Sequence, residues 1–319
     1  MKTTPKKESS NQIESQTPML GEYAYQVIRQ QYQAIVKLEK KVLADVDPEH
    51  LHHMRVGTRR LRTALQVFEQ VIELPKAAQA KRVGALAKIL GKLRDLDVQI
   101  ADLRDRYRPC LPEADQELID EAISQLKRER RKAFAATEDA LTRSRYRDMK
   151  TAYDAWLSEP RYTTLAQLPL VPVLPDLLSP LLATLLLHPG WLVPANQPSL
   201  ETDQTLHDLR KACKHARYQA EFFEPFYGRQ FKDWIAEIKT IQSFLGDLHD
   251  AQVLADLLRD LISSHPNSSK LQTSVRQTLT ESMADWEAMR RKYLDPDFRH
   301  QLHQLILEPT APIAENFDL

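Results

Sequence analysis

The sequence predicts an all-α protein built from two related halves, each with about four helices. Three observations lead to this fold class: apolar residues recur at spacings of three and four along most of the chain, glycine is scarce, and the two halves share sequence. Only seven of the 319 residues are glycine, and neither GxGxxG nor the P-loop pattern GxxxxGK occurs. Rossmann, P-loop and many-turned β folds need glycine at tight turns and phosphate loops, so the sequence argues against them.

The composition predicts a folded protein whose positive charge is concentrated locally. Hydrophobic residues make up 42% of the chain and charged residues 28%, which is enough for a buried core under a solvated surface. Lys and Arg number 44, as do Asp and Glu, so any site for an anionic partner must be local. Cys110 and Cys213 match no metal or redox spacing and are expected to be small hydrophobic fillers in a reducing compartment.

The first part of the chain is predicted to be a tail followed by a helical half. Residues 1–18 contain no apolar stretch that would suit a signal peptide, and their polar composition indicates disorder. The first half follows at residues 19–158. Apolar spacing predicts helices over residues 23–46 and 116–142, and Pro48 stands near the start of a further helix, where proline is tolerated.

Residues 159–199 are predicted to form a proline-rich linker that ends in a short buried helix. Eight of the 19 prolines lie between Pro160 and Pro198. Residues 165–195 carry a single charge, but the prolines interrupt the run of about 20 apolar residues that a membrane span requires. We therefore expect no membrane partner and a soluble, cytoplasmic protein.

The second half, residues 200–308, repeats the first at one constant offset. LHHMRVGTRRLRTALQVFE at residues 51–69 aligns without gaps with LHDLRKACKHARYQAEFFE at residues 206–224. At the same offset, ILGKLRDLDVQIADL at residues 89–103 aligns with FLGDLHDAQVLADLL at residues 244–258. Two blocks that match at one offset indicate an internal duplication, so the two halves are predicted to form one domain.

Each copy of the first block places a row of cations beside an apolar stripe when it is drawn as a helix. Like charges four residues apart, such as Arg55 and Arg59, destabilise a helix, so a row retained in both halves indicates an anion site. Arginine presents a planar fork that binds phosphate oxygens in pairs, which favours an extended chain of phosphates as the anion. The first basic row is His52, Arg55, Arg59 and Arg62, and the second basic row is His207, Arg210, Lys214 and Arg217.

These motifs resemble the CHAD family, the conserved histidine α-helical domain. The resemblance rests on the pattern His-x-x-Arg-x-x-x-Arg-Arg-x-Arg, then LGKLRDLDV, LHDLRKACKHARYQAEFF and FLGDLHDAQV, and it extends from about Leu20 to about residue 305. It implies two four-helix bundles related by a pseudo-twofold axis, with basic residues lining a groove or pore between them. The partner CYTH domain of many family members has the signature ExExK, which does not occur in this sequence.

The resemblance also implies a function, namely non-catalytic binding of inorganic polyphosphate by the two basic rows. It implies association with polyphosphate granules and requires neither a cofactor nor a metal. Asp95 and Asp250 are expected to orient the arginines through charge-assisted hydrogen bonds. Further candidate contacts, which lie away from the main rows, are Arg60, Lys88, Arg94, Arg128, Arg131, Lys211, His215 and Lys239.

Two departures between the halves bear on pH. His215 stands where the first half has Arg60, and Ala216 where it has Leu61, which predicts a weaker or more pH-dependent second row. Bound phosphates favour charged histidine, so His52 and His207 predict that affinity rises as pH falls from about 8 to about 6.

Three alternative functions follow from the same residues. A helical nucleic-acid binder would also use rows of cations, although zero net charge and the lack of a recognised motif argue against it. The pairs His207-Asp208 and His249-Asp250 occur in metal-dependent phosphohydrolases, although neighbouring cations disfavour a metal. The third alternative is a scaffold that binds acidic proteins.

Overall fold

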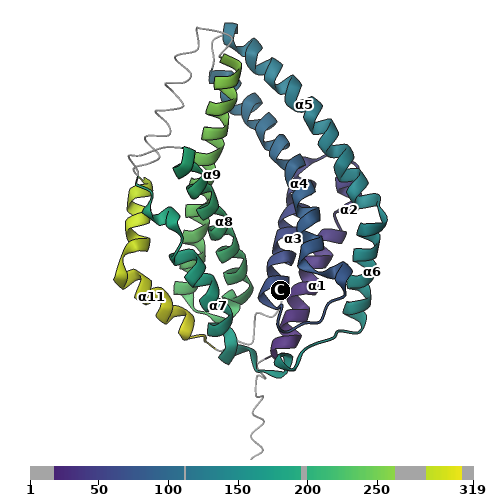
Figure 1. Cartoon of the computed structure of the whole chain (residues 1–319), viewed down its shortest axis with the longest axis vertical. Coiled ribbons are helices and arrows are strands. Elements are labelled where there is room, and N and C mark those ends of the chain that lie inside the picture. The colour runs from purple at the N-terminus through teal and green to yellow at the C-terminus, as the bar shows by residue number, and fades with distance from the viewer. Residues whose placement is uncertain (1–17, 111–112, 195–199, 263–284, 311–319) are drawn as a thin grey trace, which may run out of the picture.

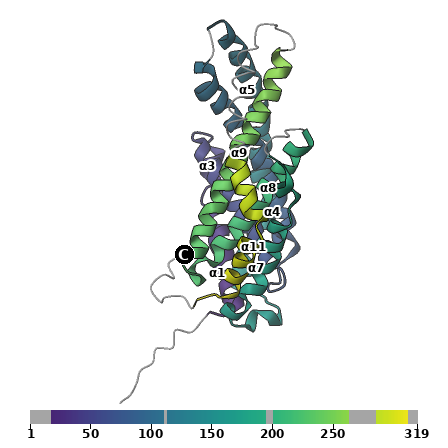
Figure 2. The same cartoon turned by 90° about the vertical axis from the view of Figure 1, so that its left-hand side faces the viewer.

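All regular elements in the described part of the chain are helices, which confirms the all-α prediction. The computed structural model describes residues 18–110, 113–194, 200–262 and 285–310. Residues 1–17 of the predicted tail lie outside these ranges. Figure 1 shows two groups of helices side by side, joined at the lower end of the view. Figure 2 shows that α9 runs along the long axis and extends beyond α7 and α8 toward the end where α5 lies.

The first group contains six α-helices and three short helical segments. The α-helices are α1 (Leu20–Val36), α2 (Glu39–Leu43), α3 (Pro48–Val67), α4 (Ala80–Ala101), α5 (Glu113–Thr142) and α6 (Ser144–Ser158). The short segments are the 3-10 turns Lys76–Ala78 and Arg108–Cys110 and the π-helical segment Asp102–Tyr107. Helix α3 packs between α1 and α4, and α5 packs along α4.

The second group has a similar order. It contains α7 (Leu170–Leu186), α8 (Leu200–Phe223), α9 (Arg229–Ile262), a helix at residues 285–294, and α11 (Pro296–Leu307). Short 3-10 turns lie at Pro189–Leu192 and Glu224–Phe226, and a further turn, Thr164–Gln167, packs against α1 of the first group. Helix α8 packs against α7 and α9, and α7 also packs against α11. The aligned sequence blocks therefore occupy corresponding helices, α3 with α8 and α4 with α9.

Helix α3 illustrates how local sequence determines an element of the site. The Asp47 side chain caps its start by accepting a hydrogen bond from the backbone N–H of Glu49 at 2.9 Å, and Pro48 occupies the first turn. Its apolar stripe, including Met54 and Leu61, is fully buried. The neighbouring face of the helix is thereby left for the basic row.

The predicted short helix within residues 159–199 is longer than expected. Helix α7 begins at Leu170 and contains Pro175 and Pro180, although the sequence analysis expects prolines to interrupt it. Each internal proline removes one backbone hydrogen bond, and the burial of Leu174 and Leu178 offsets that cost. Because α7 packs on α8 and α11, it is a core element of the second group.

The hydropathy of this segment is explained by its burial. Among the described residues, the segment Leu170–Leu192 is long and apolar enough to cross a membrane, judged by length and composition alone. Leu187 and Leu192 of this segment are exposed. Seven of its leucines on α7 are buried in the protein core: Leu170, Leu174, Leu178, Leu181, Leu182, Leu185 and Leu186.

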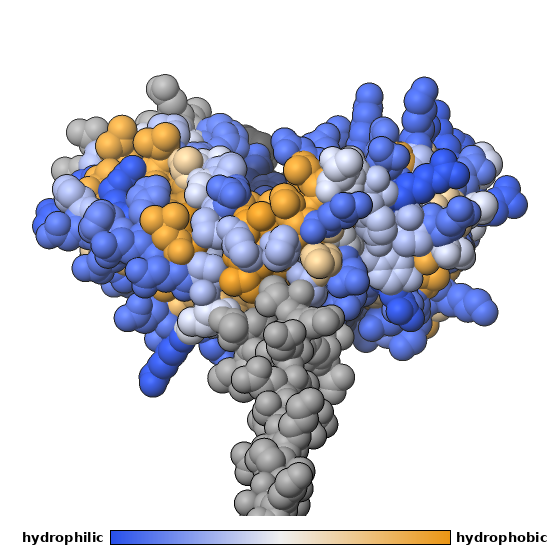
Figure 3. Space-filling view, turned by 90° about the horizontal axis from the view of Figure 1, so that it is seen from below, coloured by the Kyte–Doolittle hydropathy of each residue, from blue (hydrophilic) through white to orange (hydrophobic). Residues whose placement is uncertain are grey.

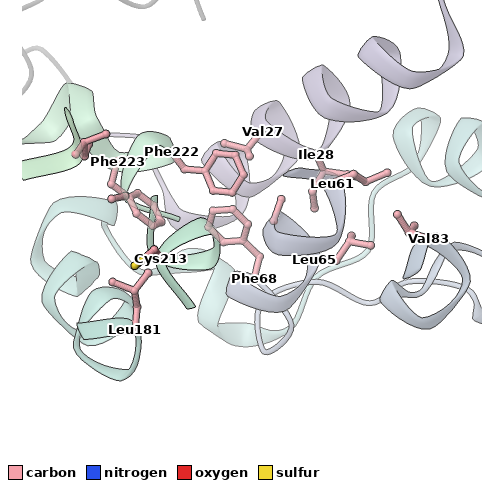
Figure 4. Packing of buried hydrophobic residues seen from close by; sticks show 14 of the residues in the cluster. Val27, Ile28, Leu61, Leu65, Phe68, Val83, Leu181, Cys213, Phe222 and Phe223 are labelled. Carbon is pink, nitrogen blue, oxygen red and sulfur yellow. The ribbon is translucent and has the colours of Figure 1, made fainter. Parts of the chain in front are cut away.

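The two groups share a core where α3 and α8 end. The rings of Phe68 and Phe223, which occupy aligned positions in the two halves, meet edge to face with centroids 6.0 Å apart. Tyr23 of α1 stacks on Phe223, and its hydroxyl donates a hydrogen bond to the carbonyl of Phe222. Figure 4 shows Phe68 and Phe222 between the packed residues of α1 and α3 and those of α7 and α8. The two aligned phenylalanines therefore meet at the junction of the two groups of helices.

The lower end of the molecule shows the same division from outside. Figure 3 shows two largely hydrophilic lobes that are joined across an apolar centre and separated by a notch on one side. The halves are thus held together at one end, and the space between α3 and α8 is left for the site.

Candidate anion-binding site

Both basic rows line a single cavity between the two groups of helices. The cavity has a volume of about 970 Å³, and all eight residues of the two rows contribute to its wall. The first row comes from α3 and the second from α8, and these helices contact each other. Four of the additional candidates also line it: Lys88 and Arg94 from α4, and Lys211 and His215 from α8.

The structure places the other four additional candidates outside the cavity wall: Arg60, Arg128, Arg131 and Lys239. Arg60 pairs with Glu221 instead, and Lys239 is exposed on α9. Arg128 and Arg131 are exposed on α5. The arginine of that stretch that turns inward is Arg130, which pairs with Asp45 at 2.7 Å and Asp97 at 2.6 Å. These ion pairs raise the pKa of Arg130 and hold α5 against its neighbours.

In each half, the arginine at the aligned position Arg55 or Arg210 lies over a glycine of the neighbouring helix. A Cβ atom on Gly91 of α4 would lie 3.4 Å from Nε of Arg55, and one on Gly246 of α9 would lie 2.6 Å from Nη2 of Arg210. At Gly246 the missing side chain therefore makes room for the guanidinium, whereas a Cβ atom on Gly91 would be in ordinary van der Waals contact with Arg55. The sequence analysis aligned these glycines but did not identify their contact with arginine. The Leu-Gly pair that occurs in both repeats was the signal that could have revealed it.

Arg55 is a largely buried cation of the cavity wall that has a carboxylate partner. Its Nη2 donates a hydrogen bond to Oδ1 of Asp95 at 3.1 Å, the arrangement expected for an orienting carboxylate. Burial, followed by the nearby charge of Arg59, lowers the pKa of Arg55 to about 10, so it stays protonated at neutral pH. The other expected orienting carboxylate, Asp250, has a side chain that lies outside the described residues.

Several cations of the cavity have no acidic partner in the described part of the chain. Among the described residues, no carboxylate lies within ion-pair distance of Arg59, Arg62, Lys88 or Arg210. The Nε atoms of Arg55 and Arg210 are also buried without a hydrogen-bond partner in the described structure. A buried donor without a partner is costly, and cations gathered on one wall repel one another, so this wall is suited to an anionic ligand.

Two histidines of the cavity are biased toward the neutral form. Burial, followed by the charge of Arg94, lowers the pKa of His52 below its ordinary value. His215 is exposed, yet desolvation by the surrounding protein, followed by the charges of Arg62 and Arg59, lowers its pKa. A bound anion would act in the opposite direction on both residues.

The residues that suggested a phosphohydrolase are arranged as follows. Asp208 accepts a hydrogen bond from Nζ of Lys211 at 2.8 Å, which lowers the pKa of the carboxyl group. The side chains of His249 and Asp250 lie outside the described residues. In the part of the chain that the structure describes, no three His, Cys, Asp or Glu side chains are grouped so that they could hold a metal ion.

The cavity wall also contains polar residues that the sequence analysis did not identify. Gln242 of α9 accepts a hydrogen bond from Nε of Arg217 at 3.0 Å, and Tyr218 lies beside the same guanidinium. Gln99 and Asp102 line the cavity near the end of α4. No charge row or repeat marks these positions, so nothing in the sequence distinguishes them from other polar residues.

An all-helical fold with two corresponding sets of helices around a cationic cavity defines the class of protein. The chain belongs to the CHAD domain family, whose model matches residues 26–259. The structure is similar to the crystal structure of the CHAD domain from the plant Ricinus communis, with 25% sequence identity and a TM-score of 0.58 over 93% of this chain and 95% of that one.

The fold is also similar to that of PptA from Streptomyces chartreusis. The sequences are 16% identical, and the TM-score is 0.56 over 90% of this chain and 99% of that one. No curated protein matches the chain.

Proposed function

We propose that this protein binds inorganic polyphosphate in the cavity between its two halves and does so without catalysis. The observation that carries the proposal is the excess of cations on the cavity wall. Nine lysines and arginines line it, against the two acids Asp95 and Asp102. Membership of the CHAD family supports the same ligand, as does the resemblance of both basic rows to the motifs of that family.

The arrangement of the charges favours a linear polyanion over a single phosphate group. Cations stand on α3, α4 and α8, on opposite walls of one cavity, so a ligand with one charge per repeating unit meets several of them together. Arginine forks bind phosphate oxygens in pairs and remain charged at any physiological pH. By the same proposal the protein acts in the cytoplasm, at polyphosphate granules.

Calorimetry with long-chain polyphosphate tests the proposal. The wild-type protein is compared with the double variant Arg55→Ala/Arg210→Ala, which removes one cation from each row. A matched control, Arg128→Ala/Arg131→Ala, removes two exposed arginines of α5 outside the cavity. We expect tight, salt-sensitive binding that the cavity variant loses and the α5 variant retains, with circular dichroism showing that all three proteins are folded.

Competition separates polyphosphate from nucleic acid. If the cavity is specific for polyphosphate, this ligand displaces labelled single-stranded DNA at a much lower concentration of phosphate groups than DNA displaces labelled polyphosphate. Equal displacement would favour the nucleic-acid alternative, because both ligands would then bind through backbone charge alone. Release of orthophosphate during the titration would contradict a non-catalytic role.

A further inference from the structure

One carboxylate bridges the two halves beside the cavity. Glu221, near the end of α8, accepts a hydrogen bond from Nη1 of Arg60 on α3 at 2.6 Å. It also accepts one from Nη1 of Arg217, one turn earlier on α8, at 2.5 Å. The three side chains are largely buried, with 17% of Glu221, 29% of Arg60 and 15% of Arg217 exposed. A partly desolvated pairing of this kind is stronger than a surface ion pair.

Arg217 lies in the cavity wall, but the protein already uses much of its hydrogen-bonding capacity. Its Nη1 is committed to Glu221, its Nε donates to Oε1 of Gln242, and its guanidinium lies 4.6 Å from the ring centroid of Tyr218. Arg60 faces the same aromatic surface, 5.6 Å from the ring of Phe222 and 6.0 Å from that of Tyr218. The two arginines and the carboxylate therefore form one unit across the junction of the halves.

The equivalent arginine of the first half has none of these partners. Arg62 aligns with Arg217, but Gln66 stands where the second half has Glu221, and Ala87 where it has Gln242. Arg62 is exposed, lies over Gly84, and has no carboxylate within ion-pair distance in the described structure. Because of these two differences between the repeats, Arg62 is available to a ligand, whereas Arg217 is held by Glu221 and Gln242.

We propose that Glu221 competes with the anion for Arg217. The proposal rests on the proposed function. In this view the ligand is bound asymmetrically, chiefly by Arg59, Arg62, Lys88 and Arg210, while Arg217 ties α8 to α3. Glu221 therefore limits the affinity of the cavity for polyanions and stabilises the contact between the halves.

Two reciprocal substitutions test the competition. Glu221→Gln removes the competing charge with little change of shape, and Gln66→Glu introduces it at the equivalent position, four residues after Arg62. Calorimetry with size-fractionated polyphosphate is run between about 50 and 200 mM NaCl. We expect E221Q to bind about threefold or more tightly, with a log–log salt slope steeper by about 0.7, the value for one added phosphate contact. Q66E should change both quantities in the opposite direction.

Weaker binding or a shallower salt slope in E221Q would overturn the proposal, because it would mean that Glu221 orients Arg217 toward the ligand. A second measurement needs no polyphosphate. We expect the melting temperature of unliganded E221Q to fall at low salt and to recover in sodium sulfate, which supplies a replacement anion. Glu224→Gln is the control, because it removes the same charge from an exposed pair with Lys232 at 3.6 Å.

The two measurements separate this proposal from the proposed function. If wild-type protein fails to bind polyphosphate, the proposed function is rejected. If the melting temperature of E221Q equals that of the wild type at low salt, the tie between the halves is rejected, whatever the ligand.

Discussion

The arginines of this protein differ in function according to what stands beside them. Arg130 and Arg60 pair with carboxylates that belong to other helices and hold the fold together. Arg59 and Arg62 face the cavity and have no carboxylate within ion-pair distance among the described residues. Cations that share one cavity wall repel one another and an anion would relieve that repulsion, so we assign the proposed anion binding to this second kind of arginine.

At the residue scale, His215 leads us to predict that affinity for polyphosphate depends on pH. Desolvation by the surrounding protein, followed by the charges of Arg62 and Arg59, lowers the pKa of His215 below its ordinary value in the free protein, which favours the neutral form. A bound anion raises that pKa, and binding then takes up a proton. Affinity for polyphosphate should therefore rise several-fold as pH falls from about 8 to about 6. Calorimetry at fixed ionic strength, repeated in buffers with different ionisation enthalpies, measures both the affinity and the proton uptake.

The variant His215→Ala should reduce this pH dependence, and His52→Ala/His215→Ala should reduce it further, since the pKa of His52 is also lowered. A dissociation constant that does not change with pH in the wild-type protein would contradict the prediction. So would the same pH profile in all three proteins.

At the scale of elements, the packing of helix pairs aims the arginines. Helices α3 and α4, like α8 and α9, approach each other with a guanidinium lying over a glycine. The two glycines leave different amounts of room, because a Cβ atom would lie 3.4 Å from Nε of Arg55 but 2.6 Å from Nη2 of Arg210. The second arginine is therefore the more closely held.

Substituting these glycines by alanine should separate stability from binding. Alanine favours a helix interior over glycine by about 1 kcal/mol, so Gly91→Ala should raise the free energy of unfolding and leave binding unchanged. Gly246→Ala should displace the guanidinium of Arg210 and weaken polyphosphate binding, without a comparable loss of stability. Urea unfolding and calorimetry on both variants measure the two effects. Equal affinities would show that Arg210 does not bind the ligand from this position.

Helix α7 forms although two prolines stand inside it. Proline is unfavourable inside a helix by about 3 kcal/mol, and α7 contains two internal prolines. Its leucines at spacings of three and four are buried against α8 and α11, and complete burial of a leucine contributes about 1.5–3 kcal/mol. Summed over seven buried leucines, burial outweighs the cost of the prolines.

At the scale of the whole molecule, the site depends on how the halves are joined. Phe223 contacts Phe68 and Tyr23 of the other half, and it is fully buried. Phe223→Ala should destabilise the protein by about 3–5 kcal/mol and also weaken polyphosphate binding, because α3 and α8 lose a contact that sets the cavity. Urea unfolding and calorimetry measure these two quantities.

The control for this prediction is Phe231→Ala. Phe231 is equally buried but packs against Tyr227 and Trp234 within the second half. It should cost similar stability and affect binding less. If both variants bind with the same affinity, the contact between Phe68 and Phe223 does not control the cavity.

Much of this protein could be predicted because the relevant signals are local. The spacing of apolar residues reports helices, and the repeat shows that the same helix occurs twice. The eight residues of the two basic rows were identifiable because side chains three and four residues apart share one face of a helix. The chemistry of arginine then indicated phosphate.

The remaining features depend on contacts between distant parts of the chain. The sequence by itself determined the helical class, the duplication and the identity of the two rows, since these follow from short-range periodicity. Only the tertiary structure decided that Arg60 faces Glu221, 161 residues away, while Lys88 and His215 face the cavity. It also decided that α7 continues through its prolines. The physical reason is the same in each case, because burial and ion pairing are energies of the packed state and arise only when separate helices come together.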